Sequence, residues 1–406
     1  MSLANAHPLI VPAPQLPGVV ARAVRRLALD RLRRDWSGAR LDLALPSGEL
    51  VRLGGRGPAE ARAVVRDDRL FARLLVRGEL GAGEGFVAGD WDADDVVAVI
   101  RAFLRGTRAR GAESPLTWLG QLATRLRHRR AANTRDGSVR NIHAHYDLGN
   151  AFYSLFLDDA TLAYSCALWP ASSLAAAQQR KFDRLCDLLE LSASDHVLEI
   201  GCGWGGMAIH AARTRGCRVT AITVSRAQAE LARKRVAAAG LSDRVTIELR
   251  DYRDVSGEFD KLVSIEMLEA VGHAFLPEYF AACARSVRRG GRIAIQTITM
   301  PDDRYDAYRE GVDWMQTYIF PGSCIPSLAA IRAAAAPLAL VHCEDVGPHY
   351  APTLRAWRDA FVAKLPAVRA LGFDAPFVRS WLLYLAFSEA AFAERTLGNH
   401  HLVFAR

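Results

Sequence analysis

The strongest chemical signal in this sequence is a glycine-rich turn that directly follows an apolar segment. Residues 197–200 are apolar apart from Glu199. Three glycines at alternate positions come next, namely Gly201, Gly203 and Gly205. Glycines at such a place let the backbone turn sharply and approach a bound ligand closely. The pattern predicts a nucleotide-type pocket at the end of a buried strand.

The spacing of this turn favours S-adenosylmethionine over a dinucleotide. The run reads E-x-G-x-G, with the acidic Glu199 inside the strand end, whereas dinucleotide-binding folds carry G-x-G-x-x-G. The turn also lies in mid-chain, after a long preceding segment. Because there is no pyrophosphate to hold, we expect the helix after the turn to face the methionine part of the cofactor.

Further cofactor contacts are expected where the neighbouring strands end. The second strand should approach the ribose. The third strand ends in Asp251 beside Tyr252, where a carboxylate and an aromatic ring could bond and cover an adenine. The cofactor-binding residues predicted from the turn and the strand ends are Glu199, Gly201, Cys202, Gly203, Gly205, Thr223, Gln228, Asp251, Tyr252, Arg253 and Ile265.

The elements that must position these residues alternate along the chain. In order, we predict a helix at 174–191, a strand at 196–200, a helix at 205–215, a strand at 218–224, a helix at 226–239, strands at 245–249 and 262–266, a helix at 276–287 and a strand at 292–298. This alternation is typical of a parallel sheet covered on both faces. It predicts an α/β fold, a Rossmann-like class I S-adenosylmethionine methyltransferase domain. The last hundred residues are expected to be mostly helical.

The chain before this region predicts a smaller α+β domain. A basic helix is expected at 21–36, and a hairpin is expected around Pro46-Ser47-Gly48. A glycine-rich turn at 78–89 and a helix at 92–104 follow. Residues 116–126 fit either an amphipathic helix on an anionic membrane or a linker helix. The expected parts are a flexible tail (1–20), the small domain (21–105), a basic linker (106–140) and the methyltransferase domain (141–406).

Composition and charge narrow the setting. The 406 residues carry a formal net charge of +8, which suits contact with anionic lipid, nucleic acid or acidic protein. A genome of high GC content, which favours Arg over Lys, would give the same excess of positive charge. The seven cysteines form no C-x-x-C pair and have no metal-ligand spacing with the histidines. We therefore predict free thiols in a reducing cytosol and no metal. Neither a signal peptide nor a membrane-spanning run is evident.

Several motifs resemble those of the cyclopropane fatty-acyl-phospholipid synthases and mycolic acid cyclopropane synthases. Besides the glycine turn, they are His145-Tyr146-Asp147, Tyr164-Ser165-Cys166-Ala167-Leu168-Trp169, Asp251-Tyr252-Arg253-Asp254, Met267-Leu268-Glu269-Ala270-Val271-Gly272, Tyr318-Ile319-Phe320-Pro321-Gly322 and Val403-Phe404-Ala405-Arg406. The resemblance is strong over residues 140–406 and weak in the N-terminal region, where it is carried by residues 81–91.

The resemblance implies a cytoplasmic enzyme, peripheral at the inner membrane surface. It would transfer the methyl carbon of S-adenosylmethionine to the double bond of an unsaturated phospholipid acyl chain and form a cyclopropane. The small domain would dock lipid, helical insertions in the large domain would bind the acyl chain, and the partner would be an anionic phospholipid surface. We expect no nucleic-acid partner and allow for a homodimer.

The resemblance also assigns site residues. It implies that Tyr164 and Ser165 help to hold the cofactor. It implies a bicarbonate ion between the cofactor and the acyl chain, and the positions that would hold this ion are Cys166, Glu269, Gln296, Ile298 and Tyr350. In this scheme Glu269 orients the base that removes a proton, and the ring of Tyr350 stabilises a carbocation. Glu266 is expected near the cofactor amine.

One position departs from the family pattern and leaves the product open. The family usually has His-Thr-Ile where this chain has Gln296-Thr297-Ile298. Gln donates and accepts hydrogen bonds but cannot gain a proton near neutral pH, so an anion would lose a possible cationic partner. A methyl-branched or methylated unsaturated product therefore stays open beside the cyclopropane. Methylation of a small amine stays open as well, as does a membrane-binding role with a degenerate site.

Overall fold

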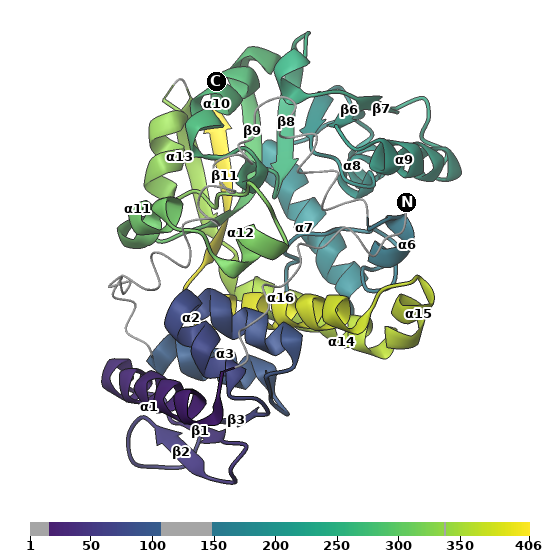
Figure 1. Ribbon diagram of the computed structural model, residues 1–406. Helices are drawn as coiled ribbons and strands as arrows, with labels where there is room; N and C mark the ends of the chain where they lie inside the picture. Colours follow the sequence, from purple (N-terminus) through teal and green to yellow (C-terminus); the bar gives the residue numbers. More distant parts are fainter. Residues whose placement is uncertain (1–15, 107–147, 337) are drawn as a thin grey trace. The chain divides into compact units, whose positions relative to one another are not determined.

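The computed structural model of this protein describes residues 16–106, 148–336 and 338–406 (Figure 1). These residues form two compact units that are interleaved in the sequence. The small unit contains the described residues of Met1–Arg130 together with Glu310–Pro321 and Leu365–Glu394, and the large unit contains the remainder. Most of the predicted tail, nearly all of the predicted linker at 106–140 and the motif at 145–147 lie outside the described residues.

A seven-stranded sheet forms the centre of the large unit. Its strands are β5 (His196–Ile200), β6 (Arg218–Thr223), β7 (Val245–Leu249), β8 (Phe259–Ile265), β9 (Val287–Thr299), β10 (Ala339–Asp345) and β11 (Gly398–Ala405), in the spatial order β10-β11-β9-β8-β5-β6-β7. The strands β5 to β9 are parallel to one another, whereas β11 is antiparallel to both β9 and β10. The predicted α/β fold is confirmed.

The two faces of this sheet bury alternating side chains of the same strands. Val197 and Val263 pack with α7 (Leu174–Leu189), α8 (Gly206–Arg215) and α9 (Arg226–Ala238). Leu198 and Leu262 pack with α10 (Leu276–Ser286) and α13 (Leu328–Ala334) on the other face. In Figure 1 the helices α8 and α9 lie beside β6 and β7, and α13 lies on the β9 side. Burial on both faces explains why these strands read as continuous apolar runs.

Two of the predicted helices, α7 and α9, begin with a serine whose hydroxyl caps the helix. The Ser173 side chain accepts a hydrogen bond from the N–H of Ala176 at the start of α7. Ser225 does the same for the N–H of Gln228 at the start of α9. Such caps satisfy donors that the helix itself leaves free, which stabilises a helix by about 1 kcal/mol.

The C-terminal region differs from the expectation of mostly helix. It contains α14 (Tyr350–Ala363), α15 (Leu365–Ala370) and α16 (Ala375–Ala393), but β10 and β11 add two strands. Polar residues such as His400 and His401 obscure the strand pattern of β11, which becomes a strand by pairing with β9 along its whole length. None of the described helices combines the length and the apolar composition that crossing a bilayer requires.

A four-stranded sheet lies in the small unit, in the order β2-β1-β3-β4. Its strands are β1 (Leu41–Ala44), β2 (Leu50–Leu53), β3 (Ala61–Val65) and β4 (Trp91–Asp92). The predicted hairpin is confirmed, because β1 and β2 pair antiparallel across a turn with Gly48 at a positive φ of 84°. Two predicted helices are also present, as α1 (Gly18–Asp35) and α3 (Val96–Gly106).

The predicted glycine-rich turn at 78–89 is wrong, because these residues mostly continue the helix α2 (Arg69–Ala88). The helix is kinked at Gly78, whose φ is 57° and ψ is −132°. The later glycines serve close packing instead. A Cβ at Gly81 would lie 2.3 Å from the carbonyl oxygen of Arg73, and a Cβ at Gly83 would lie 2.5 Å from Trp314 Cδ1.

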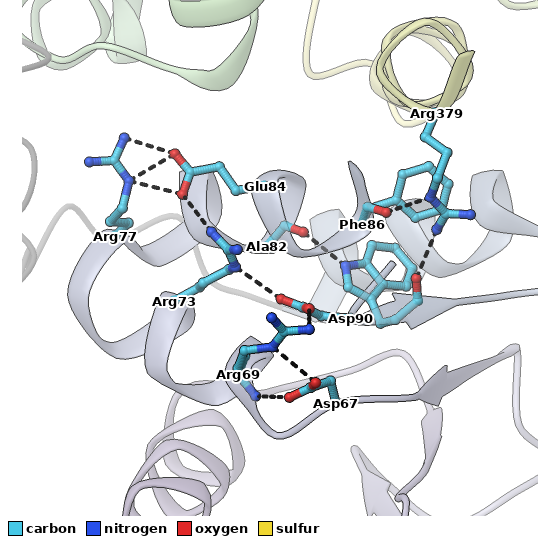
Figure 2. A network of polar contacts seen from close by, with 10 residues as sticks. Asp67, Arg69, Arg73, Arg77, Ala82, Glu84, Phe86, Asp90 and Arg379 are labelled. Atoms are coloured by element: carbon cyan, nitrogen blue, oxygen red, sulfur yellow. Dashed lines mark hydrogen bonds and ion pairs between the residues drawn. The ribbon is translucent and has the colours of Figure 1, made fainter. Parts of the chain in front are cut away.

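The small unit also takes in late segments of the chain. The helices α12 (Trp314–Tyr318), α15 and α16 belong to it, although the sequence analysis placed residues 141–406 in one domain. Leu383 and Ala386 of α16 share a core with α1, α3 and the small sheet. Arg379 of α16 donates to the carbonyl oxygen of Phe86 at 2.6 Å (Figure 2).

A buried charge network joins successive turns of α2 (Figure 2). Glu84 has no exposed surface and accepts from Arg77 Nε at 2.9 Å, with Arg73 Nη1 at 3.6 Å. Arg73 also donates to Asp90 at 2.9 Å. The hydroxyl of Tyr318 donates to Glu84 at 2.6 Å. Buried charges of this kind are stable only as a complete set.

Replacing Glu84 by Gln should therefore lower the free energy of unfolding by about 3 kcal/mol, since two arginines lose a buried counter-charge. Chemical denaturation measures this change. The control is Asp30→Asn on α1, where Asp30 pairs with Arg26 and Arg33 in solvent. That change should cost less than about 1 kcal/mol. Equal losses in the two variants would contradict a structural role for the buried network.

Candidate active site

The glycine turn after β5 has the backbone conformation of a ligand loop. Gly201, Gly203 and Gly205 have positive φ values of 80°, 51° and 80°, which residues with a Cβ adopt only at a cost. Gly206 begins α8, and a Cβ there would lie 2.4 Å from the carbonyl oxygen of Thr161. Conformation in the turn and close packing behind it both require glycine.

A pocket opens at the carboxyl ends of β5, β6, β7 and β8, beside this turn. Ligands of open parallel sheets bind at such an edge. The predicted cofactor residues that line it are Tyr164, Ser165, Glu199, Gly201, Cys202, Gly203, Thr223, Gln228, Asp251, Tyr252, Arg253 and Ile265. Gly205 shapes the turn without lining the pocket. Glu266 also lines it, together with Phe182 and Trp204, which the sequence analysis did not assign to the site.

One end of the pocket carries an acidic side chain beside an aromatic ring. The Asp251 carboxylate accepts from the N–H of Arg253 at 2.9 Å, and the Arg253 guanidinium lies 5.0 Å from the ring centre of Tyr252. At the end of β6, Thr223 donates to the side-chain oxygen of Gln228 at 2.9 Å. These contacts hold polar groups in place at the two strand ends where ribose and adenine contacts were predicted.

Glu199 is a buried carboxylate with one unused oxygen. It is 3% exposed, and its Oε2 has no hydrogen-bond partner among the described residues. Burial raises the pKa of Glu199 to about 8, against the opposing effect of the Ala208 backbone N–H. A ligand that brings N–H donors and positive charge would satisfy this oxygen. The amino-acid tail of S-adenosylmethionine has both, so the residues present fit this cofactor.

The carboxylate of Glu266 is the meeting point of four donors. Its Oε1 accepts from the N–H of Cys166 at 2.9 Å, from Gln296 Nε2 at 2.8 Å and from Asn399 Nδ2 at 2.7 Å. Its Oε2 accepts from the hydroxyl of Tyr350 at 2.6 Å. An ionised carboxylate only accepts, so it suits this set of donors, and Oε2, which accepts from one of them, keeps a lone pair that is free among the described residues.

The backbone conformation of Glu266 and a backbone hydrogen bond to β9 hold its carboxylate in this position. Glu266 has a positive φ of 47°, which is uncommon for a residue with a Cβ. Its N–H donates to the carbonyl oxygen of Gln296 at 2.7 Å. Left-handed backbone of this kind costs of order 1–3 kcal/mol and persists only where the surroundings impose it. Here β8 and β9 impose it together.

The proton positions on Gln296 follow from its neighbours. Its amide nitrogen donates to Glu266 and, at 3.2 Å, to the carbonyl oxygen of Cys166. Its amide oxygen must therefore accept from His401 Nε2, which is 2.9 Å away. Burial lowers the pKa of His401 to about 3, so this imidazole is neutral with its proton on Nε2. Gln296 is thereby oriented as a donor to Glu266.

Glu269 holds the end of β9 and does not line the pocket. Its Oε1 accepts from Thr297 Oγ1 at 3.0 Å and from the N–H of Ile298. Its Oε2 is buried without a hydrogen-bond partner among the described residues. Burial, and then the charge of Glu266, raises the pKa of Glu269 to about 8. The protonated form of Glu269 therefore predominates near neutral pH.

The residues expected to hold bicarbonate do not fit a separate anion. Cys166, Gln296 and Tyr350 donate to Glu266, and the N–H of Ile298 donates to Glu269. A bicarbonate ion at this point would lack these donors and would add a charge beside a carboxylate, which is costly in a buried site. This chain supplies a carboxylate from its own side chain at the position where the resemblance implied an ion.

Sequence reasoning did not foresee the central place of Glu266 or its contact with Asn399. The signal that could have found them was a polar run, Asn399-His400-His401, in an otherwise apolar C-terminal stretch. That run becomes informative only once β11 is known to lie beside β9. The register pairs Asn399 with Ile298 and His401 with Gln296, which brings the amides of Asn399 and Gln296 to one carboxylate.

Fold and pocket together define a class I S-adenosylmethionine-dependent methyltransferase. The chain resembles the solved structure of the cyclopropane synthase MmaA2 from Mycobacterium tuberculosis with a TM-score of 0.62 and 25% identity, over 66% of this chain and 98% of that one. It resembles mycolic acid cyclopropane synthase CmaA1, solved with SAH and CTAB, with a TM-score of 0.61 and 26% identity, at the same coverage. The cofactor is S-adenosylmethionine.

The family model for mycolic acid cyclopropane synthetase matches residues 133–402, so the chain belongs to this family. It is 42% identical over 401 residues to a tuberculostearic acid methyltransferase of Mycobacterium tuberculosis, covering 95% of this chain and 92% of the relative. It is 34% identical over 361 residues to the cyclopropane-fatty-acyl-phospholipid synthase of Escherichia coli, covering 88% and 90%. The predicted family is confirmed, and the protein is an enzyme of the S-adenosylmethionine-dependent lipid methyltransferases.

The raised pKa of Glu269 gives a test by pH. Because the folded state favours the protonated acid, ionisation of Glu269 destabilises the fold as pH rises from the usual carboxyl range to about 8. Each pKa unit is worth about 1.4 kcal/mol. The Glu269→Gln variant resembles the protonated form and should gain a few kcal/mol on the wild type across this window, by denaturation at several pH values.

The matched control is Glu258→Gln, at a side chain that is 65% exposed. Its stability difference from the wild type should not change through the same pH window. A Glu269→Gln difference that stays constant from acid to pH 9 would rule out a protonated Glu269 in the folded protein.

Proposed function

We propose that this enzyme methylates the double bond of an unsaturated phospholipid acyl chain, and that Glu266 then takes a proton from the added carbon. The carrying observation is the Glu266 carboxylate, which lines the cofactor pocket and accepts four hydrogen bonds. A base for this step must be within reach of the methyl donor and be held in a fixed position. Glu266 meets these requirements.

The roles proposed for the cofactor residues follow the order of the strand ends around the pocket. Asp251, Tyr252 and Arg253 would hold the adenine, and Thr223 and Gln228 would hold the ribose. The glycine turn, with Tyr164, Ser165 and Glu199, would hold the amino-acid tail. When bound, S-adenosylmethionine supplies the methyl carbon as an electrophile. The chain's own contribution is orientation, because an alkene is a weak nucleophile and correct placement can contribute roughly 7–11 kcal/mol to such a reaction.

As the alkene bonds to the methyl carbon, the bond from that carbon to the sulfonium sulfur would break and S-adenosylhomocysteine would be released. A carbocation would remain on the neighbouring carbon of the chain. Aromatic faces stabilise cations by about 2 kcal/mol when water is excluded. The rings of Tyr164 and Tyr350 both pack against Trp357, with ring centres 5.2 Å and 6.1 Å apart. We propose that this aromatic wall and the negative Glu266 stabilise the cation together.

The next step can give either of two isomeric products. A C–H bond of the new methyl group breaks, the proton goes to Glu266, and the electron pair of that bond closes a cyclopropane ring. If a hydride shift places the cation on the methylated carbon first, the same electron pair forms a C=CH2 double bond between that carbon and the added carbon. Both routes remove the proton from the same carbon, so one carboxylate serves both.

We propose the methylene-bearing chain, which carries the added carbon as a =CH2 group, as the main product. The support is the 42% identity, over 95% of this chain, to a tuberculostearic acid methyltransferase. The exchange of the family's usual His for Gln296 is in keeping with a departure from cyclopropane synthesis. The second candidate is the cyclopropane, which the 34% identity to the cyclopropane-fatty-acyl-phospholipid synthase of Escherichia coli supports.

We also propose that the enzyme acts as a peripheral protein on the cytoplasmic face of an anionic membrane. The net charge of +8 supports this surface as the partner. On α1, Arg22, Arg26 and Arg33 are exposed beside the exposed Leu27, a combination that suits a lipid interface.

The test is lipid analysis of cells that express this protein. We expect a phospholipid acyl chain heavier by one CH2 group by mass spectrometry, with NMR signals of a C=CH2 group. Upfield ring-proton signals instead would support the cyclopropane. If the lipids stay unchanged while the purified enzyme methylates a small amine, the lipid substrate proposed here is wrong.

Replacing each of the two carboxylates by an amide should cause different losses of activity. Glu266→Gln removes the base and should reduce product formation by roughly 100-fold or more, while binding of S-adenosylhomocysteine by calorimetry stays near the wild-type value. Glu269→Gln is the matched control and should reduce the rate by no more than about tenfold, since Gln keeps the acceptor for Thr297 and Ile298. The reverse order of effects would assign the base to Glu269.

A further inference from the structure

Lys181 on α7 is a buried ammonium group next to the cofactor pocket. It has no exposed surface, and its Nζ donates to Ser165 Oγ at 2.6 Å. The Nζ also lies 4.6 Å from the ring centre of Phe182. Within the part of the chain that the structure describes, Lys181 makes no ion pair with a carboxylate. A buried cation without a close counter-charge is costly unless a ligand supplies one.

The contact with Lys181 decides which way Ser165 can bond. An ammonium group has only donors, so Ser165 Oγ must be the acceptor. The hydroxyl proton of Ser165 is therefore left for another partner. Ser165 lines the pocket, and its backbone oxygen is held by Gln178 Nε2 at 2.8 Å. Ser165 thus presents a hydroxyl donor to whatever occupies the pocket.

The strand order places this donor at the end of the pocket away from the adenine residues. Asp251 follows β7, which lies two strands from β5 on one side. Ser165 precedes Cys166, whose N–H bonds to Glu266 at the end of β8, on the other side of β5. A cofactor with its adenine at Asp251 therefore extends its amino-acid tail toward Ser165.

We propose that Lys181 is a positioning residue for the α-carboxylate of the cofactor: it keeps Ser165 as a hydroxyl donor and provides the positive charge that a bound carboxylate neutralises. The proposal rests on the proposed assignment of Ser165 as a cofactor contact. With Glu199 as acceptor for the α-amino group, whose positive charge would favour the ionised form of this carboxyl group, the two ends of the zwitterionic tail would meet opposite charges. Burial lowers the pKa of Lys181 to about 8 against the charge of Glu266, so the ammonium form predominates at pH 7.

Two ligands that differ by the amino-acid tail test this proposal. S-adenosylhomocysteine carries the α-carboxylate, whereas 5′-methylthioadenosine lacks the entire tail. In Lys181→Met, calorimetry should show roughly ten- to a hundredfold weaker binding of S-adenosylhomocysteine, the range expected for a hydrogen bond to a charged group. Binding of 5′-methylthioadenosine should stay within about twofold of the wild type, since the adenosine end is untouched.

Ser165→Ala should weaken S-adenosylhomocysteine in the same way, and the double variant should be no weaker than the worse single variant, because the two residues act on one carboxylate. Lys234→Met, at an exposed lysine on α9, is the control and should bind both ligands as the wild type does. Ser165→Ala also keeps the test open if Lys181→Met fails to fold.

Equal weakening of both ligands in Lys181→Met would give this lysine a purely structural role and overturn the proposal. Unchanged binding of S-adenosylhomocysteine in Lys181→Met and Ser165→Ala would overturn it as well, while leaving the cofactor pocket itself in place. A wild-type protein that binds neither ligand would instead contradict the proposed cofactor residues.

Discussion

A partly buried carboxylate that accepts from four donors joins segments of the large unit that are far apart in the chain. Glu266 follows β8, and its donors come from Cys166, from Gln296 on β9, from Tyr350 at the start of α14 and from Asn399 on β11. Each of these segments has to reach the same point before the carboxylate is satisfied. The order β11-β9-β8 in the sheet makes this possible, since it brings three of the segments side by side.

The cofactor pocket next to this carboxylate contains buried polar groups that the protein alone does not fully pair. Glu199 has a buried oxygen without a partner among the described residues, and Lys181 is a buried ammonium held by one serine. A zwitterionic tail brings one charge of each sign, so under the proposed assignments it would complete both groups at once. Glycines without side chains in the turn after β5 leave the room for such a ligand.

The small unit depends on the same rule of complete pairing. Glu84, Arg73 and Asp90 are buried charges of α2 and the turn after it, and Tyr318 from a much later part of the chain adds a donor. The helix α16 contributes buried side chains to the hydrophobic core of this unit. Segments that lie more than two hundred residues apart are therefore needed to form this unit, which explains why the chain passes between the two units several times.

Local patterns were enough to predict the parallel strands around β5, the helices α7 to α10, the hairpin of the small unit and the glycine turn with most of its pocket residues. These features follow from side-chain periodicity and from the conformational freedom of glycine, which act over a few neighbouring residues. The glycines of α2, the strand β11 and the role of Glu266 did not follow. Each depends on a residue distant in the chain: Trp314 packed on Gly83, β9 paired with β11, and Asn399 bonded to Glu266. Such contacts exist only after folding has brought the segments together. Packing and buried hydrogen bonds depend on which atoms are close in three dimensions, whereas periodicity depends only on the spacing of residues along the chain.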